Sequence, residues 1–467
     1  MNGTFDVIVL GAGIAGLSAA TRLAESGARV LVLEARPGAG GRATAFTDPR
    51  SGERIDNGQH ALFGCYHDTF RLLERIGTRH LVRLEPRLAL DLVLPDGRPT
   101  RLQPPALPAW LPGSVPLAAA VLAWKPLSLA ARLSVLRLAG PVRRAQAALK
   151  RGTSLEALGL VRPGETVEQW LQRHGQGVRL VDWLWEPLAL AALNQPMQVA
   201  AAGPFLRVLA ALLNGGPEQA ALALPSVPLD ALYVEPSARY LAARGGELRC
   251  GQRARLLPGP GGGLRVQTRE HRWDAASVIS AVPWHAMPDA LGAMAEGVPA
   301  LAATLADASA TPAVPIVTVN LWYDRPVLEG PVLGLPGRVF QWAFEQRRLA
   351  GGTTHVSLVS SGAAEVAHQS NQALGALAAA ELEGAVPAAR GAVLRRTQAV
   401  REVRATFALA PGQPARPTGT TSVPGLFLAG DWIETGLPAT IEGAAVSGHW
   451  AAESARAYLQ TRSFQSR

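Results

Sequence analysis

The sequence predicts an α/β fold of two domains. One is a parallel-sheet domain assembled from discontinuous segments, and the other is an α+β domain with a large helical block. Three observations predict this. A chain of 467 residues is too long for one compact core. Short apolar runs alternate with helical segments near both ends of the chain, and residues 105–225 consist mainly of helical patterns.

The first element is a strand–helix–strand unit at the N-terminus. Residues 6–10 form a short apolar run, residues 11–27 have helical character, and residues 28–35 form a second apolar run. This order within about thirty residues is typical of a βαβ unit. The turn between the first strand and the helix carries the glycine pattern Gly11-x-Gly13-x-x-Gly16, and the second strand ends at Glu34.

Each residue of this pattern has a physical role in binding a dinucleotide. Gly11 permits a tight turn, Gly13 lets the backbone approach a pyrophosphate, and Gly16 lets the helix pack on the strand. The helix N-terminus offers oriented N–H groups to the phosphates. Glu34 can accept hydrogen bonds from both ribose hydroxyls, and its charge would repel a 2′-phosphate. The unit therefore predicts a Rossmann-like domain that binds FAD or NAD.

Two further segments favour FAD. Residues 34–42 place Arg36 and Arg42 around a second glycine pair, and arginine is suited to bidentate phosphate contacts. Near the C-terminus, a short strand ends in Gly430-Asp431, and a helix begins near Thr440. Asp431 could hold a ribitol hydroxyl, while the helix N-terminus could stabilise negative charge on a reduced flavin ring.

The remaining elements divide between the two domains. Short strands are expected near residues 247–256, 264–269 and 276–281, a longer strand at 314–323, and a closing helix at 441–458. The segments that resemble the first unit, with short apolar strands and a helix after the last of them, form the FAD-binding domain. The rest form the substrate-binding domain. We predict the boundaries 1–104, 226–289 and 418–467 for the first domain, and 105–225 and 290–417 for the second.

The glycine-rich unit, residues 278–283 and residues 426–448 together resemble the FAD-dependent amine oxidase and carotenoid desaturase superfamily. Within it, residues 55–66, 182–196 and 319–327 resemble the hydroxysqualene dehydroxylases, also called squalene-associated FAD-dependent desaturases. The resemblance implies a bacterial FAD-dependent oxidoreductase of squalene and hopanoid synthesis. Such an enzyme converts hydroxysqualene, an apolar isoprenoid, to squalene by reductive removal of the hydroxyl.

The resemblance also implies where the cofactor lies. In the superfamily the first segment binds ADP, the strand near residue 254 packs against adenine, and the last helix caps the isoalloxazine ring. The expected FAD contacts are Gly11, Gly13, Ala15, Gly16, Glu34, Ala35, Arg36, Gly41, Arg42, Gln59, His60, Ala254, Gly430, Asp431, Thr440 and Ile441. We expect non-covalent FAD, because no cysteine follows Cys250.

Candidates for acid–base chemistry are few. His60 lies in the segment expected near the flavin, and Glu186 lies beside Trp185 and Pro187 in the helical block. Burial beside apolar rings would raise the pKa of Glu186 and keep it protonated as a donor to a leaving hydroxyl. The alternative interpretation is that Glu186 only starts the helix at Pro187 and that His60 is a packed loop residue.

Three other functions fit the same fold. A carotenoid (phytoene-type) desaturase shares the flavin and an isoprenoid substrate. The resemblance implies that many amine oxidases carry a lysine near the flavin N5 in the strand equivalent to 314–323, but no lysine follows Lys150. A non-catalytic flavin-binding partner subunit remains the third alternative. Turnover of hydroxysqualene would separate these readings.

Charge and cysteine usage indicate the partners. The net charge is +9, but the arginines are dispersed and do not interleave with aromatic residues, so we expect no nucleic acid partner. The two cysteines show no metal-ligand spacing, so we expect no metal and a reducing cytoplasm.

No apolar run reaches the ~18 residues of a helix that spans a membrane. Residues 117–151 combine apolar runs with cations, which suits peripheral contact with an anionic membrane surface on its inner face.

Overall fold

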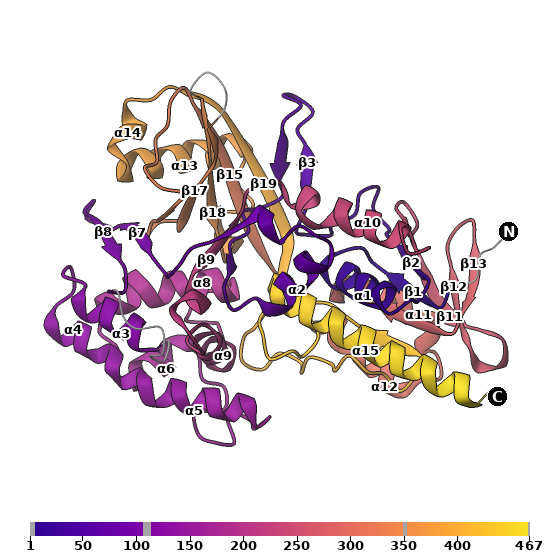
Figure 1. Cartoon of the computed structure of the whole chain (residues 1–467). Coiled ribbons are helices and arrows are strands. Elements are labelled where there is room, and N and C mark those ends of the chain that lie inside the picture. Colours follow the sequence, from indigo (N-terminus) through magenta and orange to yellow (C-terminus); the bar gives the residue numbers. More distant parts are fainter. Residues whose placement is uncertain (1–4, 106–113, 349–352, 466–467) are drawn as a thin grey trace.

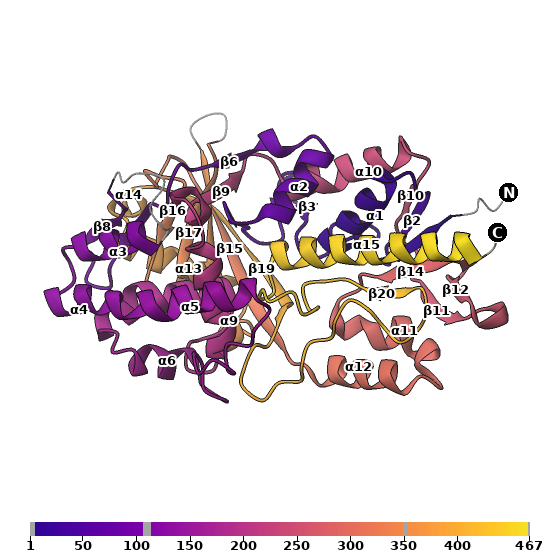
Figure 2. The same cartoon turned by 60° about the horizontal axis from the view of Figure 1, so that its bottom comes forward.

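The computed structural model describes residues 5–105, 114–348 and 353–465. Figures 1 and 2 show an elongated molecule with the parallel sheet at one end; at the other end a second large sheet lies above the helical block in the view of Figure 1. Both termini lie at the parallel-sheet end. Residues 106–113, which belong to the predicted helical block, lie outside the described residues.

The parallel sheet is built from segments that are far apart in the chain. All of its neighbouring strands pair in parallel. This arrangement confirms the predicted α/β domain of discontinuous segments. The strand order is β10 (Glu247–Arg249), β2 (Val30–Leu33), β1 (Val7–Leu10), β14 (Ser277–Ser280) and β20 (Leu426–Leu428).

Alternate residues of β1 enter two different cores, because successive side chains of a strand point to opposite faces. Val7 and Val9 pack with α1 (Ile14–Glu25) and α15 (Ile441–Gln465), which lie side by side on one face of the sheet (Figure 2). Ile8 and Leu10 belong to the core on the other face. That face carries the antiparallel strands β11 (Arg255–Pro258), β12 (Leu264–Gln267) and β13 (Arg272–Ala275), with α11 (Met287–Ala295) and α12 (Pro299–Ala310).

The second large sheet is mixed and has seven strands. One face is covered by α13 (Asn371–Ala385), next to α14 (Pro387–Arg390) (Figure 1). Strands β7 and β8 come from the segment 1–104 and join this sheet, so the chain passes between the two sheets early. The order is β19 (Leu394–Phe407), β15 (Ala313–Tyr323), β18 (Thr354–Ser360), β17 (Trp342–Arg348), β16 (Val332–Gly334), β7 (Leu90–Val93) and β8 (Pro99–Leu102).

Smaller elements join the two halves. A hairpin of β3 (Ala45–Thr47) and β4 (Arg54–Asp56) lies beside the seven-stranded sheet. Strand β9 (Leu222–Pro225) pairs with both β5 (Leu62–Phe63) and β6 (Val82–Leu84). Helix α2 (His67–Arg75) packs against α15, and α10 (Glu235–Ala242) packs against α1 and β10.

The helical block is the predicted one. Its buried side chains form one continuous apolar core that extends into the parallel-sheet domain. Within residues 5–105, 114–348 and 353–465, no helix is both long and apolar enough to cross a bilayer. The helices of the block are α3 (Ser114–Ala123), α4 (Leu129–Ser134), α5 (Ala139–Lys150), α6 (Val167–Arg173), α7 (Val178–Leu180), α8 (Glu186–Leu193) and α9 (Ala202–Leu212).

Candidate cofactor and substrate site

The first and third glycines of the pattern, Gly11 and Gly16, are required by the fold itself. Gly11 has φ +100°, and a Cβ there would lie 2.8 Å from the Ala281 carbonyl oxygen. A Cβ at Gly16 would lie 1.9 Å from the Gly11 carbonyl oxygen, so only glycine lets α1 pack this closely on the turn. Ala15 is buried in the first turn of α1.

Gly13 differs, because the space beside it is open. It precedes α1 as the N-cap residue, with φ −81°. Among the described residues, a Cβ at Gly13 would meet only the Cα of Gly41, at 4.0 Å. Gly41 itself has φ +63°, which turns its backbone toward Gly13. The N–H groups at the start of α1 therefore face an opening bordered by backbone, which is the geometry that binds a pyrophosphate.

Glu34 is fixed at the end of β2 by two backbone donors. The Ala12 amide donates to Glu34 Oε2 at 2.8 Å, and the Arg36 amide donates to Glu34 Oε1 at 2.9 Å. The residue is 8% exposed. A carboxylate has about four acceptor positions, so acceptors remain for ribose hydroxyls. Ala35 is exposed next to it, and Ala254 lies half-buried on the neighbouring segment.

Arg42 joins the two ends of the sequence at this site. Its Nη2 lies 2.6 Å from Asp431 Oδ1, and its Nη1 donates to the Ala405 carbonyl oxygen at 2.8 Å. Its guanidinium also lies 5.5 Å from the ring centre of Trp284. Gly430, with φ +139°, directs the chain into Asp431, which is buried. Arg42 and Asp431, which were predicted separately as cofactor contacts, therefore lie side by side.

Positive charges converge near His285. Burial, together with the nearby charges of Arg404, Arg42 and Arg36, lowers the pKa of His285 to about 4. This clustering of cations suits the two negative charges of a pyrophosphate. Sequence reasoning missed Arg404 and His285, because they lie far along the chain from the glycine-rich turn and belong to no motif.

The N-terminus of α15 is capped and anchored. Thr440 Oγ1 accepts a hydrogen bond from the Gly443 amide at 3.0 Å, and Ile441 is the first residue of the helix. Glu442 is buried and accepts bonds from the Asp68 and Thr69 amides, both at 2.9 Å. Burial raises the pKa of Glu442 to about 6. An acidic residue inside an otherwise apolar helix start was the signal that could have revealed Glu442.

The loop that contains Gln59 and His60 lies against the seven-stranded sheet. Gln59 Oε1 accepts a hydrogen bond from Gln346 of β17. His60 Nδ1 bonds to the Gly58 carbonyl oxygen at 2.7 Å, so Nδ1 carries the proton and Nε2 is an acceptor. Burial lowers the pKa of His60 to about 4, with a further contribution from Arg42. At neutral pH His60 is uncharged, which suits an acceptor better than an acid.

Glu186 lies in a different environment. It begins α8, and Asn194 at the other end of that helix donates to the Val314 carbonyl oxygen at 3.2 Å. A helix rises about 1.5 Å per residue, so Glu186 lies about 12 Å along α8 from this contact with β15. Burial raises the pKa of Glu186, and the carboxylates of Asp182 and Glu168 raise it further. The structure groups Glu186 with other carboxylates of the helical block.

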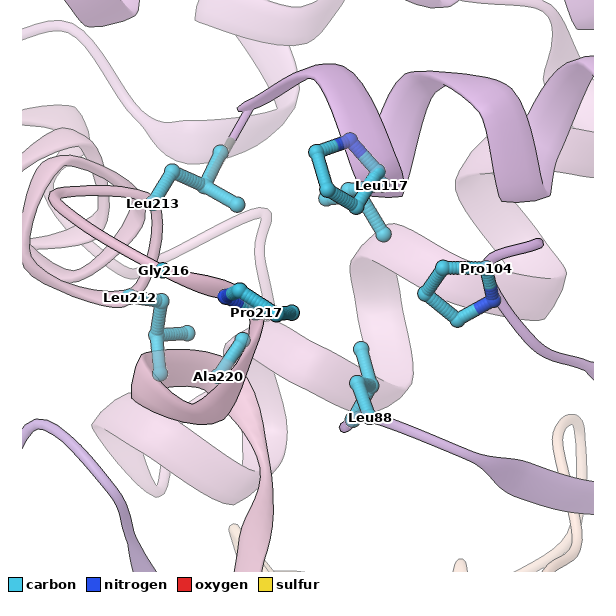
Figure 3. Close-up of a pocket in the computed structure, with 9 residues that line it drawn as sticks. Leu88, Pro104, Leu117, Leu212, Leu213, Gly216, Pro217 and Ala220 are labelled. Atoms are coloured by element: carbon cyan, nitrogen blue, oxygen red, sulfur yellow. The ribbon is translucent and has the colours of Figure 1, made fainter. Parts of the chain in front are cut away.

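An apolar pocket opens between α3, α9 and the segment before β9 (Figure 3). Its cavity volume is about 10 Å³, roughly the room that one water molecule needs, and no charged side chain lines it. Such walls suit a hydrocarbon. The lining residues are Leu88, Pro104, Pro116, Leu117, Leu212, Leu213, Gly216, Pro217 and Ala220.

The two cysteines are free thiols. Cys65 is largely buried, and burial raises the pKa of its thiol. Cys250 is exposed near Glu34, and burial of its thiol together with that carboxylate raises its pKa. The described residues hold no group of His, Cys, Asp or Glu side chains arranged to bind a metal ion.

Comparison with known proteins gives consistent results. Residues 14–455 match the family described as flavin containing amine oxidoreductase. A hydroxysqualene dehydroxylase of Rhodopseudomonas palustris is 32% identical and covers 96% of this chain and 97% of its own. A hydroxysqualene dehydroxylase of Sinorhizobium fredii is 29% identical, and the match covers 98% of this chain and 99% of the relative. A putrescine oxidase structure, a triple mutant, aligns with a TM-score of 0.72 at 17% identity over 97% of this chain and 99% of its own. These similarities confirm the resemblance that the motifs indicated.

Proposed function

Because the chain belongs to the flavin-containing amine oxidoreductases and, within them, to the hydroxysqualene dehydroxylases, we propose that it converts hydroxysqualene to squalene. In this reaction the C–O bond breaks, a hydride forms the new C–H bond, and the hydroxyl oxygen leaves as water after taking a proton. The observation that carries the proposal is similarity over nearly the full chain to proteins of that name, rather than over the cofactor motif alone. The proposed setting is bacterial squalene and hopanoid synthesis.

The cofactor of this proposal is FAD held without a covalent bond. The open helix start at Gly13, the carboxylate of Glu34 and the cations around His285 fit the ADP portion. The capped start of α15 fits the flavin portion, because a helix N-terminus stabilises negative charge. The neutral, buried Cys65 thiol supports non-covalent binding. When bound and reduced, FAD supplies the hydride.

The residues of this chain would then position the substrate and exclude water. Apolar side chains of the helical block, some of which line the small pocket of Figure 3, would surround part of the isoprenoid chain and keep water from a cation formed when the hydroxyl departs. Glu186, with its raised pKa, is the proposed proton donor to the leaving hydroxyl, and neutral His60 is proposed to accept a hydrogen bond from a bound ligand through Nε2. In the described part of β15, no lysine takes the position expected for an amine oxidase.

Reaction of the reduced enzyme with its substrate tests the proposal. The holoenzyme is reduced anaerobically and mixed with hydroxysqualene in a stopped-flow instrument. We expect the absorbance of oxidised flavin to return, squalene to form, and deuterium placed on the reduced flavin to appear in the squalene. If the flavin stays reduced while phytoene reduces the oxidised enzyme, the protein is a desaturase. If amines reduce it, it is an amine oxidase. If none of these reacts, it is a flavin-binding partner without turnover.

We also propose that α4 and its neighbours contact an anionic membrane surface on the cytoplasmic side. Leu129, Leu133 and Leu136 are 63%, 47% and 47% exposed, and their spacing places them on one face. Exposed Val178 and the cations Lys125, Arg137 and Arg179 flank this face. Apolar side chains beside cations suit the headgroup layer, where an apolar substrate would be dissolved. Flotation with anionic vesicles at low salt tests the contact, and a triple change of the three leucines to serine should abolish it.

A further inference from the structure

Strand β15 presents two chemically different faces. Val317, Val319 and Leu321 pack in the apolar core under α13. The alternate residues Thr318 and Asn320 lie on the other face, because strand side chains alternate in direction. They are 2% and 1% exposed, so this second face is also buried. It is the face toward the loop of Gln59 and His60, since a Cβ at Gly58 would lie 3.7 Å from Thr318 Oγ1.

The amide of Asn320 is held in one orientation. Its Oδ1 accepts a hydrogen bond from the Ser357 hydroxyl at 2.5 Å and lies 2.8 Å from His355 Nε2, which donates to it when the ring carries its proton on Nε2; both partners are on the adjacent strand β18. This leaves Nδ2 pointing away from these donors. Nδ2 is buried, and no atom of the described residues accepts its hydrogens. A buried amide donor is normally bonded, so this one is available for a ligand.

The complementary group lies directly across the sheet. Asn320 pairs with Gln398 of β19 in the strand register. Opposed residues in an antiparallel pair share a face, with Cβ atoms about 5 Å apart. The Oε1 of Gln398 is buried as well, and nothing in the described part of the chain donates to it. One free donor and one free acceptor therefore lie next to each other, with the unpartnered Thr318 hydroxyl on the same face.

An alcohol hydroxyl has the complementary pair of groups, one acceptor oxygen and one donor hydrogen. We propose that Asn320 and Gln398 together bind the hydroxyl group of the substrate. Asn320 Nδ2 donates to the hydroxyl oxygen, and the hydroxyl hydrogen is donated to Gln398 Oε1. This inference rests on the proposed function and deepens it, since it names the groups that distinguish hydroxysqualene from squalene.

Two consequences follow for the reaction. A site built to bond a hydroxyl binds an analogue without that hydroxyl poorly, because its buried polar groups are left unpaired. The product squalene would therefore leave more readily than the substrate. Donation from Nδ2 also stabilises negative charge on the hydroxyl oxygen as the C–O bond lengthens.

Equilibrium binding to the oxidised holoenzyme tests the inference, because the oxidised enzyme cannot reduce the substrate. Hydroxysqualene and squalene are titrated separately, and the flavin absorbance reports binding. We expect the wild type to bind hydroxysqualene more tightly. Gln398→Met keeps the length of the side chain and removes the acceptor, so the preference should fall about tenfold while squalene affinity is unchanged or improved. Thr397→Val, on the same strand but the opposite face, is the matched control and should leave the preference unchanged.

Two further variants keep the test independent of folding. Gln398→Glu retains an acceptor oxygen and should restore part of the preference. Asn320→Asp retains the oxygen that His355 and Ser357 bond but removes the donor, so it should weaken hydroxysqualene binding alone. The inference is overturned if these variants weaken the binding of hydroxysqualene and of squalene equally, which would mean that the two amides have a structural role or bind a water molecule. It is also overturned if the wild type binds the two compounds equally well. If the proposed function itself is wrong, the observation is different: the flavin of the reduced wild-type enzyme stays reduced when hydroxysqualene is added.

Discussion

The guanidinium of Arg42 lies 2.6 Å from the carboxylate of Asp431, although 389 positions separate the two residues. Asp431 is buried, and Arg42 also bonds the Ala405 carbonyl oxygen. The contact fixes the segment after the dinucleotide turn against the segment before the last helix. In the proposed site the ion pair would lie where the pyrophosphate and the ribitol of FAD meet.

The first prediction concerns this pair. Arg42→Lys keeps the charge but loses the planar fork that can contact Asp431 and a phosphate at once. We expect the Kd of the apoprotein for FAD to rise about tenfold. Quenching of flavin fluorescence during titration measures it. Arg265→Lys, which alters an exposed pair with Asp274, is the control. If the wild type and Arg42→Lys bound FAD with equal affinity, Arg42 would not be a cofactor contact.

The second prediction separates cofactor binding from folding. Among the described residues, a Cβ at Gly13 would meet only the Gly41 Cα, at 4.0 Å, so Gly13→Val should fold yet be purified without FAD, because the added atoms occupy the proposed pyrophosphate position. Its Tm should match that of wild-type apoprotein. Gly16→Val should instead fail to fold, since its Cβ would collide with the Gly11 carbonyl oxygen. Full FAD occupancy in Gly13→Val would contradict the assignment. FAD bound to wild type should be released by acid or heat.

The third prediction concerns acid stability. The pKa of His60 is about 4 in the folded protein and 6.5 ordinarily. Between these pH values the unfolded chain takes up a proton that the folded protein does not, so acidification from pH 6.5 toward 4 lowers the free energy of unfolding. His60→Gln takes up no proton there, and its stability should fall less over this range. Glu442 acts in the opposite direction between pH 4.5 and about 6 and is common to both proteins.

Denaturant unfolding of the wild type and His60→Gln at several pH values measures this difference. His67→Gln serves as the control, because His67 is exposed at the start of α2. Parallel curves for wild type and His60→Gln would show that His60 is protonated normally in the fold.

The fourth prediction tests Glu186 as the proton donor. Glu186→Gln keeps the size of the side chain but cannot give up a proton, so kcat should fall by about 100-fold or more while KM changes little. Glu168→Gln alters a neighbouring carboxylate and should leave kcat near wild type. Rapid-quench measurement of squalene formation from the reduced enzyme gives both constants. An unchanged kcat in Glu186→Gln would mean that Glu186 only begins α8.

The sequence by itself determined the features whose cause is local. The glycines at 11, 13 and 16, the strands on either side of α1 and the acid at Glu34 lie within thirty residues, so their mutual geometry follows from turn sterics and helix packing. The start of α15 was similarly visible in Thr440. Full-length motif resemblance then indicated the family, which the comparisons confirm.

Only the tertiary structure decided which distant groups meet. The pairing of Arg42 with Asp431, the gathering of cations around His285, and the anchoring of α15 by Glu442 join segments with no local signal for each other. Strands β7 and β8 join the seven-stranded sheet, although the sequence analysis placed residues 1–104 in the FAD-binding domain.

The alternation of polar and apolar residues in β15 was visible, but its meaning was not. The register that sets Asn320 opposite Gln398 depends on how two strands about eighty residues apart pair. A strand pattern specifies which residues share a face, whereas the partner across the sheet depends on the packing of the whole chain.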